Sequence, residues 1–235
     1  MTAKRIPSGM SSTLVLAGVT WLRLVRGRAL WVSLLIAALP CLYAVMMRGP
    51  DGSRAITDEL YAFEILVLAI LAPMFISSSL GEEIEDRTTT YLWSRPIPRW
   101  AVLAGKLLAL VPIVIAIACA SWLAAANIAW SMMPPARSFL ALALGATGIA
   151  MIATGIATIA PKHGMALTIC YLLFFDLPIG VLPATLQEMS VTHQLRTLSG
   201  LWPIDGTFVE GLVGLTIIAA VWAALAIVRI RRLEA

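Results

Sequence analysis

One polar stretch of the chain concentrates side chains that could bind a partner or do acid–base chemistry. Residues 81–106, GEEIEDRTTTYLWSRPIPRWAVLAGK, carry eight charges in 26 residues. Its acidic turn comprises Glu82, Glu83, Glu85 and Asp86. We expect Gly81 to break the preceding helix, residues 88–92 to continue the acidic turn as a short helix, and Pro96 and Pro98 to end it rigidly. Such a helix could dock into a partner's groove and transmit force; the alternative is a solvated turn.

A catalytic interpretation of the same residues is weak. Residues 82–87, EEIEDR, fit the EExxxR pattern of membrane proteases that process prenylated proteins and bacteriocins. Those enzymes also need histidines in an FxxxH pattern, but Ile159 stands four positions before His163 and Met189 four before His193. The sequence also has no HExxH metal motif and no GxSxG nucleophile elbow. We therefore assign no catalytic residue and no metal site, and we expect the three cysteines to serve apolar packing.

The rest of the chain predicts what must position this stretch. Hydrophobic residues make up 60% of the sequence and charged residues 13%, against about 25% in soluble proteins. Apolar runs close to the ~20 residues that a helix needs to cross a bilayer occur six times. They lie at 30–47, 63–80, 103–130, 139–160, 165–182 and 208–228. The sequence predicts an all-α, polytopic membrane protein with six transmembrane helices, and residues 1–235 as a single domain.

The distribution of lysine and arginine predicts the orientation. Six spans place both termini and the loops after the second and fourth helices on one side of the membrane. That side holds 13 of the 17 basic residues, so both termini and residues 81–100 should be cytosolic. The net charge of +4 therefore reports topology, and no basic cluster interleaved with aromatic residues suggests nucleic acid. Upstream of the first span, residues 10–28 have the spacing of a basic amphipathic helix lying in the headgroup region.

Three charged residues fall within or beside the predicted spans. Asp176, in the fifth span, is a candidate intramembrane functional residue, because a charge at the bilayer centre costs about 2.5–3.5 kcal/mol. Alternatively, it caps backbone groups freed near Pro178 or lies protonated in the bundle. We expect Glu64 to reach the outer headgroups and Lys106 the inner ones. In the fourth span Ala141, Gly145, Gly148 and Gly155 form one smooth face, which predicts a buried helix.

The order of residues in the polar stretch resembles the type-2 ABC transporter permease family. The resemblance rests on the acidic turn followed by Arg87-Thr88, then YLWSRPIPR at 91–99, then Gly105-Lys106. In that family this loop is the coupling helix, so the resemblance implies that residues 81–100 contact an ATPase subunit. The implied contact residues are Glu82, Glu83, Glu85, Asp86, Arg87, Thr88, Arg95 and Arg99. Arg87 stands where many members have glycine. Residues 182–193 resemble, more weakly, the re-entrant or interfacial segment before the last helix of that family.

The resemblance also implies partners. The chain has no GxxxxGK[ST] phosphate loop, so ATP and Mg²⁺ would be bound by a separate ABC-type ATPase subunit and no cofactor by this chain. A second permease copy, identical or related, and membrane lipids would complete the complex in a bacterial cytoplasmic membrane. We expect a subunit that couples ATP hydrolysis to export or conformational work; the alternative is a non-transporting scaffold whose acidic loop recruits a cytosolic partner.

Overall fold

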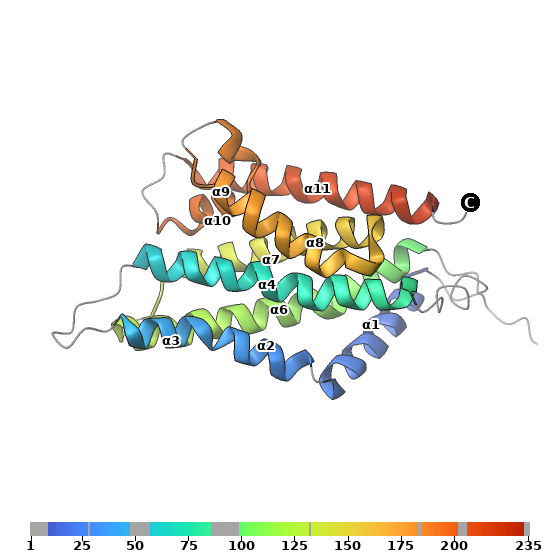
Figure 1. Cartoon of the computed structure of the whole chain (residues 1–235), viewed down its shortest axis with the longest axis horizontal. Coiled ribbons are helices and arrows are strands. Elements are labelled where there is room, and N and C mark those ends of the chain that lie inside the picture. The colour runs from blue at the N-terminus through green and yellow to red at the C-terminus, as the bar shows by residue number, and fades with distance from the viewer. Residues whose placement is uncertain are drawn as a thin grey trace, which may run out of the picture.

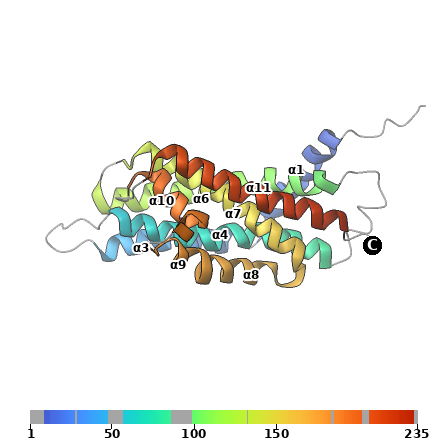
Figure 2. The ribbon, with the colours of Figure 1, turned by 90° about the horizontal axis from the view of Figure 1, so that it is seen from above.

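The computed structural model describes residues 9–27, 29–47, 57–85, 99–131, 133–182, 185–201 and 206–232. All regular secondary structure within these ranges is helical, as the sequence predicts. Figures 1 and 2 show the long helices running along a common axis, with α1 set obliquely at one end. The start of α1 and the C-terminal end of α11 lie at this same end of the bundle.

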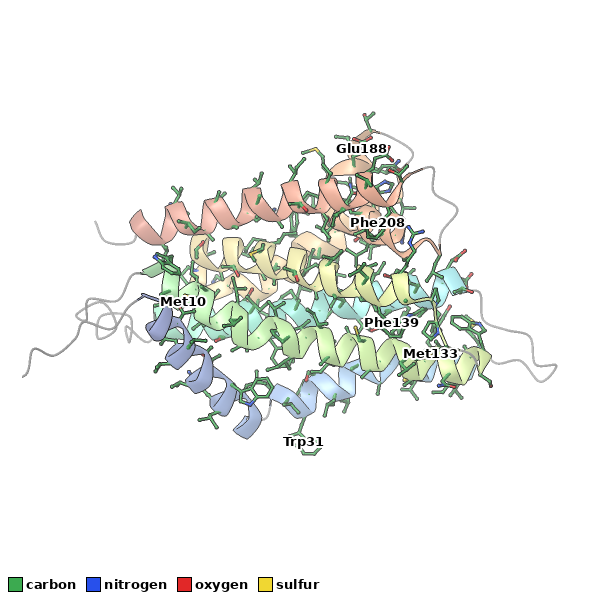
Figure 3. The ribbon with its side chains drawn as sticks, turned by 180° about the vertical axis from the view of Figure 1, so that it is seen from behind. Met10, Trp31, Met133, Phe139, Glu188 and Phe208 are labelled. Carbon is green, nitrogen blue, oxygen red and sulfur yellow. The ribbon has the colours of Figure 1, made fainter. Side chains whose placement is uncertain are left out.

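The N-terminal helices lie on the outside of the bundle. The helix predicted for residues 10–28 is confirmed as α1 (Gly9–Arg26), and it packs on α6. The first predicted span consists of α2 (Ala29–Ala37) and α3 (Leu39–Met46), which are separated at Ala38 just before Pro40. A proline at this position removes a backbone donor, which accounts for the interruption. Figure 3 shows Trp31 of α2 pointing away from the other helices, and this side chain is 75% exposed.

The centre of the bundle consists of α4 (Thr57–Glu85), α6 (Arg99–Trp130) and α7 (Ala136–Ile159). The glycines of α7 allow close contacts with three neighbours, because a Cβ at each position would collide with a side chain of another helix. At Gly145 the neighbour is Leu195, at Gly148 it is Leu215 at 2.7 Å, and at Gly155 it is the ring of Trp222. The predicted buried position of the fourth span is therefore confirmed.

The predicted fifth span is a composite of shorter segments. After the 3-10 turn η1 (Pro161–His163) come α8 (Gly164–Tyr171), the π-helical η2 (Leu172–Asp176) and α9 (Leu177–Ile179). Among the described residues, five helices are long and apolar enough to cross a membrane, and the composite at 164–179 is not one of them. The shorter apolar helix, Thr13–Leu24, lies within α1, so the structure supports five of the six predicted spans. The 3-10 turn η3 (Thr185–Met189), α10 (Val191–Ser199) and α11 (Phe208–Arg232) complete the chain.

Candidate functional site

The predicted acidic loop joins two central helices at one end of the bundle. Glu82, Glu83 and Glu85 lie in the last turns of α4, and Arg99 is the first residue of α6. The structure describes the backbone of these four residues but not their side chains. The other predicted contact residues, Asp86, Arg87, Thr88 and Arg95, lie outside the described residues.

Gly81 does not break the helix, and that prediction is wrong. Helix α4 continues through it to Glu85, so the first acids extend a membrane helix instead of forming a separate short one. A Cβ on Gly81 would lie 2.6 Å from the carbonyl oxygen of Pro161 in η1. Glycine at this position therefore permits a close backbone approach between α4 and the fourth-to-fifth loop.

Lys106 also differs from the prediction. Its side chain is buried, 3% exposed, instead of extending to the headgroups, and its Nζ donates a hydrogen bond to the carbonyl oxygen of Ser79. Ser79 lies two residues before Gly81, so this bond ties the start of α6 to the end of α4. The sequence identifies the lysine, but it cannot predict that a carbonyl oxygen on the neighbouring helix accepts a hydrogen bond from it.

Two further elements meet the same end of the bundle. A Cβ on Gly105 would lie 2.9 Å from the carbonyl oxygen of Thr13 and 3.1 Å from Cβ of Leu16, so α1 lies directly against α6. His163, in η1, is exposed. Helices α1, α4 and α6 and the turn η1 are thus linked by short contacts next to the ends of the acidic loop.

Asp176 organises the opposite end. Its buried carboxylate accepts hydrogen bonds from the backbone N–H of Val191 (2.8 Å) and of Thr192 (2.9 Å). The hydroxyl of Thr192 donates to it as well (2.7 Å), and the single hydroxyl proton of Ser190 is shared between the carboxylate (3.2 Å) and the backbone carbonyl oxygen of Asp176 (2.8 Å). These donors surround the first turn of α10, where backbone N–H groups have no partner within the helix. The carboxylate therefore fastens the end of η2 to the start of α10, a partner that neither interpretation of the sequence identified.

Helix α10 is short but completely enclosed. All nine of its residues are buried, polar side chains included, and it packs on α7 and α11. Ser190 caps its first turn by accepting from the N–H of His193, and Gly200, at φ +65°, ends it in the left-handed region. Burial lowers the pKa of His193 below the ordinary 6.5; nearby Arg196 acts in the same direction and Glu188 opposes it. Helix α10 is thus packed inside the bundle before the last helix begins.

Glu64 is a third departure from the sequence prediction. Its side chain is fully buried in α4 and does not extend outward. The hydroxyl of Ser121 in α6 lies 3.0 Å from its Oε2 and 2.7 Å from the carbonyl oxygen of Ala37, so its single proton is shared between the two acceptors. These contacts join α4, α6 and α2, and a hydrophobicity pattern cannot reveal a partner that is 57 residues away.

Together these features define a multi-pass, all-helical membrane protein with the acidic residues 82–85 at one end and the buried helix α10 at the other. A profile of the family described as ABC-2 family transporter protein matches residues 49–205, more than half of the chain, and includes both features. The chain belongs to this family, and the resemblance of the polar stretch is confirmed at that level. A search of curated proteins found no match.

Proposed function

We propose that this chain is the permease subunit of an ABC transporter and that residues 81–100 dock on a separate ATPase subunit. The observation that carries the proposal is the unbroken course of α4 from Thr57 to Glu85. The part of α4 that follows its internal proline, Pro73, extends without interruption through Gly81 into the acidic turn, so a force applied at Glu83 reaches the membrane-embedded part directly.

The contacts beside the loop support transmission to neighbouring elements. Lys106 links α4 to α6, the helix at the other end of the loop. The close approach of Gly81 to Pro161 links α4 to η1, which leads into α8. Exposed His163 in the same turn would face the ATPase as well. A displacement of the acidic turn would thereby move three helices instead of one.

The proposed complex has two permease copies, identical or related, each docked on one ATPase subunit that binds ATP and Mg²⁺. The chain would lie in a bacterial cytoplasmic membrane with both termini in the cytosol, and nucleotide-driven movement would power export or conformational work. A non-transporting scaffold, the second candidate, would use the acidic loop only to recruit its partner.

The two candidates differ in how ATP turnover responds to the loop. The full-length chain is purified with its ATPase and reconstituted, and Glu83→Ala/Asp86→Ala is compared with wild type. We expect ATP hydrolysis to change severalfold, because the contact that links the two subunits is removed. The matched control is Asp58→Ala/Glu59→Ala, which removes two acids from the opposite end of the same helix and should leave turnover unchanged. If ATP hydrolysis did not change in Glu83→Ala/Asp86→Ala although the ATPase remained bound, the result would support the scaffold function instead.

A further inference from the structure

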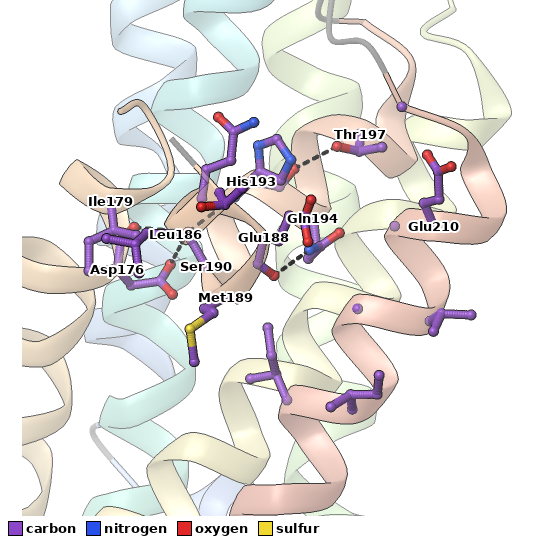
Figure 4. A pocket seen from close by; sticks show the side chains of 18 of the residues that line it. Asp176, Ile179, Leu186, Glu188, Met189, Ser190, His193, Gln194, Thr197 and Glu210 are labelled. Atoms are coloured by element: carbon purple, nitrogen blue, oxygen red, sulfur yellow. Dashed lines mark hydrogen bonds between the residues drawn. The ribbon is translucent and has the colours of Figure 1, made fainter. Parts of the chain in front are cut away.

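A cavity of about 870 Å³ lies between α11 and the composite fifth helix, away from the acidic loop. Its roof is formed by η3 and α10, and Figure 4 shows Glu188, His193 and Glu210 around this roof. The volume falls within the range of about 300–1,000 Å³ that is typical of small-molecule sites. We call this cavity the lateral groove.

The long wall of the lateral groove is apolar and faces outward. Val209, Val213, Ile217 and Val221 recur at every fourth residue of α11, form one stripe along the groove and are 52–65% exposed. At the far end lie Tyr171 and Trp222, whose ring centroids are 5.8 Å apart. From Val209 to Val221 the helix rises about 18 Å, against roughly 15 Å for the hydrocarbon of one leaflet. The wall therefore fits an extended alkyl chain that enters from the lipid.

The roof of the lateral groove is acidic. Glu188 and Glu210 are exposed there, and no lysine or arginine is among the described residues that line the groove. The third acid, Asp176, is already occupied by the N-terminal turn of α10. His193 contributes little positive charge near neutral pH, because burial lowers its pKa. Arg196 is buried one turn further along α10 and does not line the groove.

We propose that the lateral groove binds a membrane amphiphile with a cationic, ammonium-type headgroup. Its alkyl chain lies on the α11 stripe and its headgroup lies between Glu188 and Glu210. A second copy of this chain fits less well, since a symmetric contact centred on the groove would bring the two acidic roofs together. The proposal depends on the membrane location and not on the coupling mechanism proposed above.

The experiment uses three alkyl-diazirine probes with the same dodecyl chain and a trimethylammonium, maltoside or sulfate headgroup. Each is photocrosslinked to the full-length chain in neutral maltoside micelles, and labelled peptides are quantified by mass spectrometry. The ammonium probe should label residues 209–222 and 185–190 most strongly. In Glu188→Gln/Glu210→Gln its labelling should fall roughly tenfold, to the level of the maltoside probe, because two nearby charges are lost.

Glutamine at 210 keeps the acceptor for the N–H of Thr207 (2.7 Å), so the start of α11 remains capped. Asp58→Asn/Glu59→Gln, with the same loss of charge outside the groove, should label like wild type. Ile217→Trp should block all three probes, whereas Ala220→Trp, on the exposed surface beside the groove, should not. Equal labelling by the three probes, or no response to the glutamine pair, would refute the cationic headgroup. Disulfide formation between two copies carrying Val213→Cys, with the groove unlabelled, would identify a second copy as the occupant.

Discussion

The two ends of the bundle are held together in different ways. At the α10 end, Asp176 receives four hydrogen bonds and fixes a short helix whose residues are all buried. At the loop end, buried Lys106 donates to a carbonyl on α4, and two glycines permit close approaches between neighbouring segments. Satisfied buried polar groups are costly to disturb, whereas van der Waals contacts can slide. We therefore expect the α10 end to act as a fixed anchor, and the close approaches at Gly81 and Gly105 to be the contacts that can adjust.

Replacing the anchor should have the largest effect. In Asp176→Ala the N–H groups of Val191 and Thr192 lose their buried acceptor, and each unpaired group costs about 1–3 kcal/mol. We expect a loss of roughly 3 kcal/mol or more, measured as a lower thermal unfolding temperature of the purified full-length chain. Asp176→Asn should be intermediate, because the amide retains one acceptor oxygen.

Exposed Glu188 is the control for this experiment, because Glu188→Ala removes an acid from the same end without taking a buried acceptor away. Its stability, from the same unfolding measurement, should stay within about 0.5 kcal/mol of wild type. If Asp176→Ala were equally harmless, the α10 end would not be the anchor.

A methyl group introduced at Gly81, at the loop end, should reduce coupling to the ATPase more than it impairs folding of the chain. In Gly81→Ala the new Cβ would meet the Pro161 carbonyl at 2.6 Å, so α4 and η1 must separate. Overpacking of this kind costs about 1–3 kcal/mol. We expect ATPase activity of the reconstituted complex to fall severalfold while the chain still folds.

Gly18→Ala is the matched control, since a Cβ there meets nothing within 4 Å. This variant should keep full ATPase activity and should not be less stable, because alanine favours a helix over glycine by roughly 0.5–1 kcal/mol. Equal activity of the two alanine variants would show that the contact between α4 and η1 plays no part in coupling.

The smallest expected effect concerns pH at the α10 end. Because burial lowers the pKa of His193 below 6.5, the unfolded chain binds this proton more readily than the folded one. The stability contributed by neutral His193 is complete above pH 6.5 and is lost as the pH falls below it. His193→Gln should therefore reduce the difference in unfolding temperature between neutral and mildly acidic buffer.

The measurement compares His193→Gln with wild type in buffers above and below pH 6.5. An unchanged pH dependence of the unfolding temperature in His193→Gln would show that burial of this imidazole does not couple folding to its protonation.

Much of the architecture can be predicted from the sequence because it depends on local composition. The apolar runs predict the long helices, and the small residues of α7 predict the face on which Leu195, Leu215 and Trp222 pack. The N-terminal helix is predicted by its periodicity, although its spacing does not show that it lies on α6.

The departures share one physical cause, which is a partner distant in sequence. The low helix propensity of glycine predicts a helix break at Gly81. In the structure the helix continues, and glycine is needed there because the carbonyl oxygen of Pro161 leaves no room for a side chain. Glu64 and Lys106 have charges that would favour the headgroups, but Ser121 and the Ser79 carbonyl hold them inside the bundle. The lateral groove combines residues from α8 to α11, and no single segment of the sequence predicts it.

The π-helical segment η2 has a consequence for chain length. A π-turn contains one residue more than an α-turn. Within η2 the side chains of Phe174 and Phe175 are exposed, whereas that of Asp176 is buried. If these five residues were wound as a regular α-helix without loss of a residue, the rest of this composite helix would be rotated by about 100°. The carboxylate of Asp176 would then turn away from the start of α10, whose N–H groups would lose their acceptor. The number of residues in this segment thus matters as much as their identity.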